Sequence, residues 1–107
     1  MEKINKLIAN EEFDKALEII NEQLADPKTS KTSDYHFLLF AKARIYIISY
    51  SNSKPIDNNL YNAAMKHFAM ANTAHMTMHN EPYPDYQKAV DTAKNTYRIL
   101  NQRIVNK

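Results

Sequence analysis

The chain contains no glycine in its 107 residues, and this absence limits the folds open to it. Glycine supplies the positive-φ conformations of tight hairpins and of the loops that hold phosphate groups. Without it the chain lacks nucleotide-binding motifs and the Asn-Gly or Asp-Gly turns that two-residue β-hairpins prefer. Helices tolerate the lack, provided that Asn or another device replaces the glycine that often ends them. We therefore expect an all-α fold.

The composition excludes several further classes of protein. Hydrophobic residues make up 44% of the chain, which favours a packed globule over a disordered segment. Cysteine is absent, so disulfides, thiolate metal sites and cysteine nucleophiles are excluded. No stretch reaches the roughly 18 consecutive apolar residues of a membrane span, and residues 1–10 lack the apolar region of a signal peptide. We expect a single cytoplasmic domain over residues 1–107, with no membrane contact.

Three polar, proline-containing segments divide the chain into helical stretches. These segments are residues 26–33, 51–59 and 80–85. Between them apolar residues recur every three or four positions, as they do on one face of a helix. The helices expected there cover residues 11–25, 34–50, 58–79 and 86–105. The stretch at 34–50 is apolar on most of its faces, so we expect it to lie at the centre of the fold.

The first ten residues allow two arrangements. Ile4, Leu7 and Ile8 can form a short helix of their own, or one helix can run from residue 2 to residue 25. Asn10 followed by two glutamates is typical of a helix start, because Asn caps free N–H groups and acidic residues favour the first turn. A break at this point is the preferred arrangement, and it gives about five helices in all.

Two of the helical stretches repeat the same spacing of small and large apolar residues. In each, an aromatic residue is followed three positions later by alanine and four positions after that by a large apolar residue. The two sets are Phe13, Ala16 and Ile20, and Tyr61, Ala64 and Phe68. The alanine lets a neighbouring helix approach closely, and the large residues on either side fill the groove beside it.

This pattern resembles the second helix of a tetratricopeptide repeat, whose signature contains Ala-x-x-x-Phe followed by proline. Ala64 and Phe68 match that signature, and Ala43 with Tyr46 matches the small residue and the tyrosine of the family's first helix. The resemblance implies antiparallel helix-turn-helix units in a degenerate form, about two units and a capping helix. Their limits are about 1–28 for the first unit, about 34–80 for the second and about 85–105 for the capping helix.

The chain also departs from the family. The tryptophan and the glycine of the fuller pattern are missing. Ala16 and Ala64 lie 48 positions apart (64 minus 16), against a family spacing of about 34. The extra residues fall in the polar loops, where insertions are tolerated. A generic helical bundle in which the alanine spacing is coincidental remains the alternative.

The resemblance implies a non-catalytic adaptor or regulatory module that binds another protein or peptide on its concave face. The first helices of the units would line that face, here the helices at 34–50 and 86–101. The candidate partner-binding residues are Phe37, Phe40, Arg44, Ile47, Lys94 and Arg98, with Gln87 and Val90 on the same face as the last two. Aromatic anchors beside three cations suit an acidic or carboxylate-ending peptide. Alternatively, the apolar candidates belong to the core and the cations to the solvated surface.

His75 and His79 stand four positions apart on one helix face, a spacing that can bind zinc, nickel or copper. A closed site needs two more ligands, and the sequence shows none. We therefore expect no metal site and no cofactor, and these two histidines are the only candidates for a metal. No grouping of serine, histidine and acid stands out as a catalytic triad, so we expect no enzyme activity.

The main alternative function is that of a small helical regulator that self-associates or binds nucleic acid, such as a phage- or plasmid-type accessory protein. Nucleic acid is the less favoured partner, because the formal net charge is only +2 and cations alternate with acids along the chain. A short repeat stack has two ends that must be polar or covered. A homodimer formed through one end is therefore a further alternative.

Overall fold

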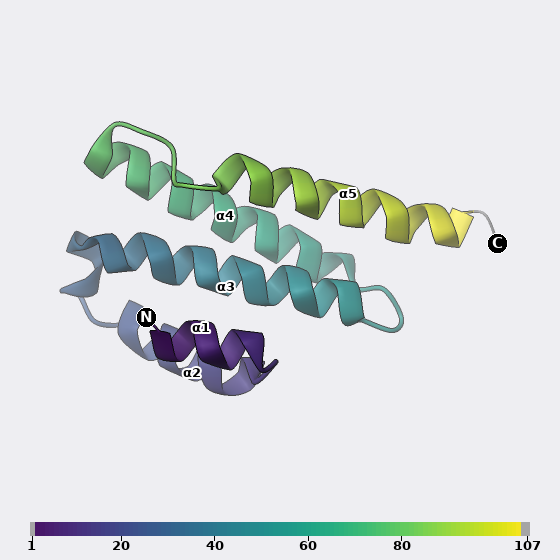
Figure 1. The fold of residues 1–107 in the computed structure, drawn as a ribbon, viewed down its shortest axis with the longest axis horizontal. Coiled ribbons are helices and arrows are strands. Elements are labelled where there is room, and N and C mark those ends of the chain that lie inside the picture. Colours follow the sequence, from purple (N-terminus) through teal and green to yellow (C-terminus); the bar gives the residue numbers. More distant parts are fainter. Residues whose placement is uncertain (1, 106–107) are drawn as a thin grey trace.

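The computed structural model describes residues 2–105, and within them it contains five α-helices and one short 3-10 helix (Figure 1). They are α1 (Glu2–Ala9), α2 (Phe13–Leu24), η1 (Thr29–Lys31), α3 (Ser33–Asn52), α4 (Asn58–His79) and α5 (Tyr86–Val105). This part of the chain contains no strand, so the prediction of an all-α fold with about five helices is confirmed. Met1, Asn106 and Lys107 lie outside the described residues, and with them the predicted ends of the domain.

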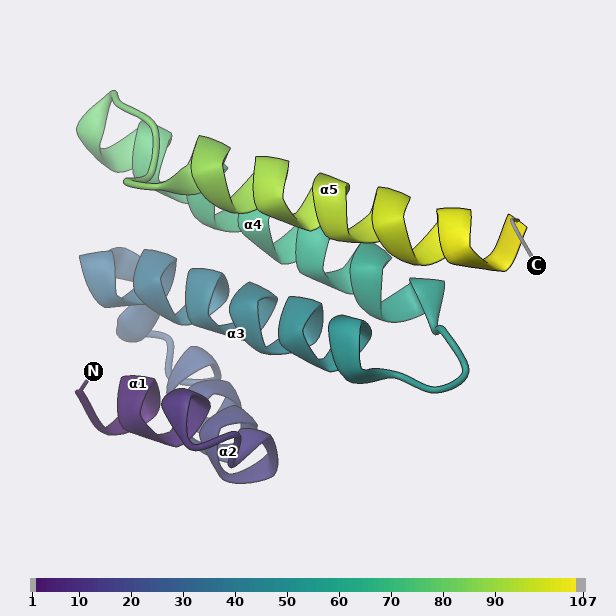
Figure 2. The ribbon, with the colours of Figure 1, turned by 45° about the vertical axis from the view of Figure 1, so that its right-hand side comes forward.

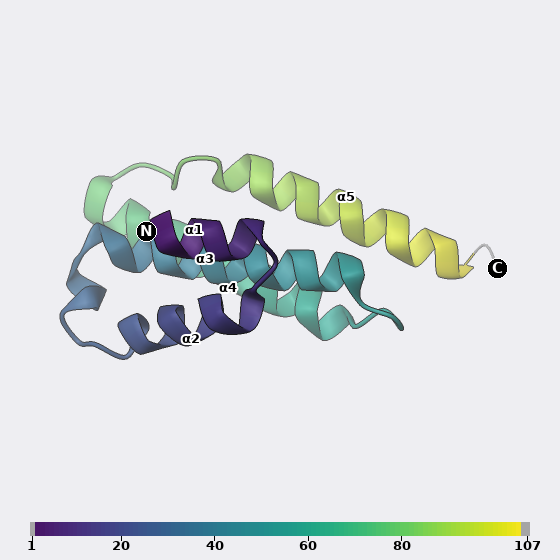
Figure 3. The ribbon, with the colours of Figure 1, turned by 60° about the horizontal axis from the view of Figure 1, so that its bottom comes forward.

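Successive helices run antiparallel and pack in chain order (Figures 1 and 2). Each helix contacts the next one, and contacts also join α1 to α3 and α3 to α5. Within residues 2–105, α2 does not touch α4 and α1 does not touch α5. Two views show α2 and α5 on opposite sides of α3 (Figures 1 and 3). The third helix therefore lies in the middle of the fold.

The central helix α3 separates two apolar clusters, as its apolar character on most faces predicts. The first cluster joins it to α1 and α2 through Ile4, Ile8, Ala16, Ile20, Leu38, Ala41 and Ile45. The second joins it to α4 and α5 through Ala43, Ala64, Phe68, Val90 and Ala93. Although α3 is apolar on two sides, none of the helices at 2–105 has both the length and the apolar character of a bilayer-spanning segment.

The two alanines of the repeated spacing are buried at helix contacts. Ala16 and Ala64 are both 0% exposed, and the large residues four positions later, Ile20 and Phe68, are buried beside them. Each alanine lies in a different cluster, one on either side of α3. A side chain of this size allows close approach of two helix backbones, which is the packing that the spacing predicts.

Three residues other than glycine adopt the left-handed conformation that glycine usually takes. Asn80 (φ 55°) ends α4, and its backbone N–H donates to the carbonyl of Met76 at 2.8 Å. Asn tolerates this region better than most residues because its short polar side chain bonds locally. The expected replacement of glycine by Asn at a helix end is thus confirmed. The other two residues are Glu11 (φ 58°) and Asp85 (φ 63°).

Residues 10–12 form the turn between α1 and α2, so the favoured break after the first ten residues is confirmed. The turn closes through the backbone N–H of Glu12, which donates to the carbonyl of Leu7 at 2.9 Å. Asn10 is not the N-cap that the sequence predicts. Its backbone N–H donates to the carbonyl of Lys6 in the last turn of α1, and Glu12 directly precedes α2. The chain uses all three residues to reverse direction, which moves the helix start beyond Asn10.

Candidate functional site

A groove with a volume of about 350 Å³ lies between α3 and α5, with α4 contributing to its floor. Its apolar lining consists of Phe40, Ile47, Ile48, Phe68, Ala89 and Ala93. Its polar lining consists of Arg44, Asp85, Lys88 and Thr92. The groove exists because α3 and α5 face each other through small residues: alanines at 89 and 93 on α5 leave space beside the larger side chains of α3.

One end of the groove is formed by an aromatic stack. The ring of Phe40 stacks on Tyr83 with centroids 4.6 Å apart, and it meets the edge of Phe68 at 5.1 Å. The backbone N–H of Tyr83 donates to Asn72 Oδ1 at 2.9 Å, which ties the loop between α4 and α5 to α4. Tyr83 therefore anchors that loop on the core. Offset stacking and edge contacts of this kind stabilise an aromatic group beyond simple burial.

The charges of the groove lie at its rim. Arg44 is half-buried, and its guanidinium donates to Asn5 Oδ1 of α1 at 3.3 Å. Burial raises the pKa of Tyr83, while the nearby Arg44 acts in the opposite direction and Asp85 in the same direction. Lys88 and Asp85 are exposed at the start of α5. The rim thus carries two cations and one carboxylate around an apolar floor.

Three of the six predicted partner-binding residues line this groove, namely Phe40, Arg44 and Ile47. Phe37 does not, because it faces the other way and packs against the cluster formed with α1 and α2. Lys94 and Arg98 do not line it either. Both are exposed on α5, and the guanidinium of Arg98 donates to Asn95 Oδ1 of its own helix.

The predicted face of α5 is therefore wrong. Val90 belongs to the core shared with α4, and Gln87 donates to Asp91 Oδ1 within α5 at 2.9 Å. The groove is instead lined by the row that contains Lys88 and Thr92. Lys88 is the binding candidate that the sequence interpretation missed, although it lies one position after Gln87. The apolar character of Val90 was the signal that could have found it, since a buried valine turns its row toward the core.

The two metal candidates, His75 and His79, lie next to each other near the end of α4, with ring centroids 4.5 Å apart. A third histidine, His36 of α3, meets both rings edge-on. It is only 2% exposed, and burial, followed by the charges of His75 and His79, lowers its pKa below the usual value. The sequence interpretation missed His36, because it comes from another helix.

The comparisons with known proteins add no identification. No protein-family model matches the chain, and no curated protein or solved structure matches it either.

Proposed function

We propose that the protein is a non-catalytic adaptor whose groove between α3 and α5 binds a peptide segment carrying an apolar anchor and acidic groups. The observation behind this proposal is that Phe40, Arg44 and Ile47, selected from the sequence alone, line one groove together. An aromatic wall beside a guanidinium is the combination from which many peptide-binding hot spots are built. A cytoplasmic location and the lack of catalysis belong to the same proposal.

The size of the groove limits how much of a partner it can hold. A volume of about 350 Å³ lies at the small end of ligand-binding pockets, which span about 300–1,000 Å³. It accommodates one or two side chains, so the rest of the peptide would lie along the surface of α3 and α5. An apolar side chain suits the floor formed by Phe68, Ala89 and Ala93.

The charge of the rim favours an acidic partner. Arg44 and Lys88 contribute two positive charges against the single carboxylate of Asp85. A guanidinium binds a carboxylate through two parallel hydrogen bonds, which adds orientation to charge. The hydrogen bond from Arg44 to the neutral amide of Asn5 leaves its charge uncompensated by that contact. A peptide carboxylate near Arg44 would supply the missing counter-charge.

The packing of the helices supports the tetratricopeptide-like part of the proposal. In a stack of helix pairs, each helix contacts its neighbours in the chain, and first helices also contact first helices. The contacts of α1 with α3 and of α3 with α5 follow this order. Under this proposal α1, α3 and α5 are the first helices of successive units, and Arg44 with Asn5 bridges two of them on the binding face.

Selection from random peptides tests the proposal for a partner of any sequence. The purified protein is presented with a phage library of random peptides, and the enriched peptides are synthesised with a fluorophore for anisotropy measurements. We expect enrichment of peptides with a large apolar residue near Asp or Glu. Ala89→Trp fills the groove and should abolish binding, and Arg44→Glu/Lys88→Glu should weaken it at least about tenfold through charge reversal at the rim.

The matched control is Lys94→Glu/Arg98→Glu, which changes the net charge equally on the exposed surface of α5 outside the groove. Its effect should be small and should vanish at high salt, because distant exposed charges are screened. Equal binding by the wild type and Ala89→Trp would contradict the groove proposal. So would equal losses in the two charge-reversal variants, and selection of no peptide would also count against it.

A further inference from the structure

Three histidines from two helices converge at the closed end of the α3–α4 pair. His36 lies in the first turns of α3, and His75 and His79 lie in the last turns of α4. The two helices are antiparallel, which brings these ends together. Each histidine offers one ring nitrogen, and the three nitrogens all lie within 4.8 Å of one another. The ring centroids of His36 lie 5.4 Å from His75 and 6.0 Å from His79.

Two buried nitrogens of this cluster lack a hydrogen-bond partner. They are His36 Nδ1 and His75 Nε2, and they are the buried side-chain atoms left unpaired among the residues that the structure describes. Buried polar atoms are nearly always paired, so each exception calls for an explanation. Both exceptions fall in the one place where three imidazoles meet. A bound metal ion would satisfy both nitrogens, since a neutral imidazole donates its free electron pair to the metal.

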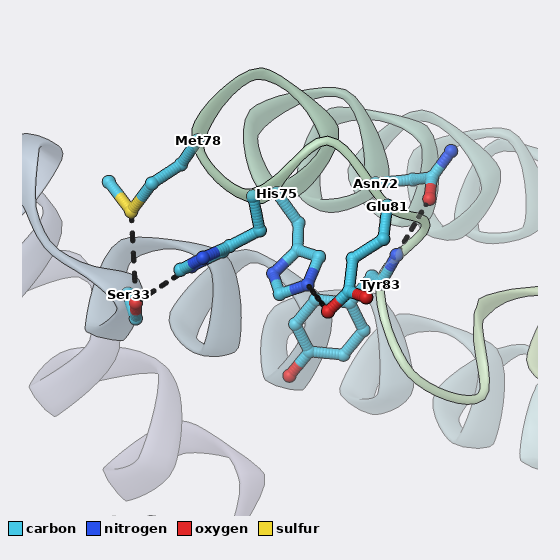
Figure 4. Close-up of polar contacts among 7 residues, drawn as sticks. Ser33, Asn72, His75, Met78, Glu81 and Tyr83 are labelled. Atoms are coloured by element: carbon cyan, nitrogen blue, oxygen red, sulfur yellow. Dashed lines mark hydrogen bonds and ion pairs between the residues drawn. The ribbon is translucent and has the colours of Figure 1, made fainter.

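Oxygen ligands also lie around the cluster. Glu81 Oε1 lies 3.8 Å from His75 Nε2, and the Glu81 side chain is 67% exposed and free to turn inward. Ser33 Oγ lies 3.2 Å from His79 Nε2 and 3.8 Å from Met78 Sδ. Figure 4 shows His75 directed toward Glu81 from one side and Ser33 facing Met78 on the other. The carboxylate therefore approaches from the loop that follows α4.

We propose that His36, His75 and His79 bind one Zn²⁺ ion, with a carboxylate oxygen of Glu81 as the fourth ligand. Three imidazoles and one oxygen form a tetrahedral donor set that zinc accepts. Nitrogens no more than 4.8 Å apart share a centre within about 2.8 Å of each (4.8 divided by √3). Zinc requires about 2.0–2.1 Å to nitrogen, so each ring needs to move inward by less than about 1 Å. Rotation of the side chains supplies such a movement without displacing the helices.

The ion would have a structural effect. It would join the beginning of α3 to the end of α4, at the end of the pair opposite the loop at residues 53–57. A metal that binds the folded chain and not the unfolded one stabilises the fold in proportion to its affinity and concentration. Ligation by Glu81 would also hold the first residue after the left-handed Asn80, and with it the start of the α4–α5 loop.

Titration of the untagged, metal-free full-length chain with Zn²⁺ tests the proposal. Isothermal calorimetry should give one ion per chain, and thermal unfolding should shift to higher temperature in the presence of the ion. Co²⁺, used as a visible probe in place of zinc, should give the intense absorption of a tetrahedral site. His75→Gln and His79→Gln, both at sites outside the deepest core, should each weaken zinc binding by at least about tenfold, and Glu81→Gln should weaken it less.

His67→Gln is the matched control, because His67 is the fourth histidine of the chain, lies on the same helix and stands outside the cluster. It should bind zinc as the wild type does. His36→Gln removes the buried ligand, and its metal-free circular dichroism spectrum should match that of the wild type before its loss of binding is interpreted. If that variant unfolds, the variants at 75 and 79 decide the question alone.

Several outcomes would overturn the assignment. They are the absence of zinc binding to the wild type, an equal loss in His67→Gln, and unchanged binding in both His75→Gln and His79→Gln. Binding of Cu⁺ that depends on Met78, combined with no binding of Zn²⁺, would likewise replace zinc by a soft ion. None of these results depends on whether the groove binds a peptide.

Discussion

The hydroxyl of Tyr50 accepts a hydrogen bond from Asn101 Nδ2 at 3.0 Å, which joins the end of α3 to the end of α5. The same hydroxyl donates to Asn58 Oδ1 at the start of α4, at 3.1 Å. Tyr50 is fully buried at 0% exposure. One oxygen atom therefore links three helices at the end of the fold that is opposite the histidine cluster.

Replacement of Tyr50 by Phe should lower the free energy of unfolding by about 1–2 kcal/mol, because two amide groups lose their partner while the ring remains. Urea unfolding followed by circular dichroism measures the change. The control is Tyr97→Phe, whose ring lies beside Tyr50 but whose hydroxyl makes no hydrogen bond to the described side chains. An equal loss in the two variants would show that the hydroxyl of Tyr50 contributes nothing specific.

Replacement of Glu11 by Gly should stabilise the protein by about 1 kcal/mol. Glu11 holds a φ of 58°, a region that costs a residue with a Cβ roughly 1–2 kcal/mol and glycine almost nothing. Glu22→Gly removes the same charge from the middle of α2 and should instead destabilise by about 1 kcal/mol. Thermal unfolding of both variants measures the two signs. Destabilisation by Glu11→Gly would contradict the assigned turn.

Enlargement of a buried alanine tests the close packing of α4 against its neighbours. Ala64→Leu places three extra carbon atoms at a position that is 0% exposed, and it should destabilise by about 1–3 kcal/mol through overpacking. Ala69→Leu, on the exposed side of the same helix, should change stability by less than about 0.5 kcal/mol. The measurement is chemical unfolding of both variants, and similar values for the two would mean that α3 and α4 do not approach closely at Ala64.

Stability should fall in mild acid because of His67. Burial lowers the pKa of His67 below 6.5, the carbonyl of Ala63 opposes that shift, and the charges of Lys42 and Lys66 add to it. Tyr46 packs on the same ring from α3. The folded state therefore binds the proton less tightly than the unfolded state does, so the stability is complete above pH 6.5 and decreases as the pH falls below it.

Two measurements check this pH dependence, both with a chelator present. An NMR titration of the His67 ring should give a pKa below that of a free histidine, and His67→Gln should flatten the acid limb of unfolding free energy against pH. Lys66→Gln, which removes one of the two cations, should bring the pKa of His67 closer to the ordinary value. A pKa at or above 6.5 in the wild type would show that burial does not control the ring.

Most of the helical architecture could be predicted from local patterns. Prolines at 27, 55, 82 and 84 mark the loops, and the apolar residues of 34–50 identify the central helix. The helix start at Asn10 was wrong by a few residues, because capping preferences are weaker than the need to close a turn. Local pattern decides where helices run, whereas tertiary contacts decide where each one begins.

The candidate site could be predicted only in part, because spacing along one helix does not show which side of it meets a second helix. Phe40, Arg44 and Ile47 share a face of α3 whatever its neighbours are, and that face does line the groove. Lys94 and Arg98 depended on how α5 is rotated against α4, which burial of Val90 determines. His36 could have been found by counting outward from the loop, since it stands about as far before Pro55 as His75 stands after it.

The ring of Tyr83 touches both of the places to which we assign ligands. It stacks on Phe40 at the wall of the groove, and it meets the edge of His75 in the histidine cluster with centroids 5.3 Å apart. Any ligand that displaces this ring from one side changes its environment on the other. Linkage then requires reciprocity: the factor by which zinc alters peptide affinity equals the factor by which peptide alters zinc affinity. A single aromatic residue would thus close a thermodynamic cycle between two otherwise separate receptors.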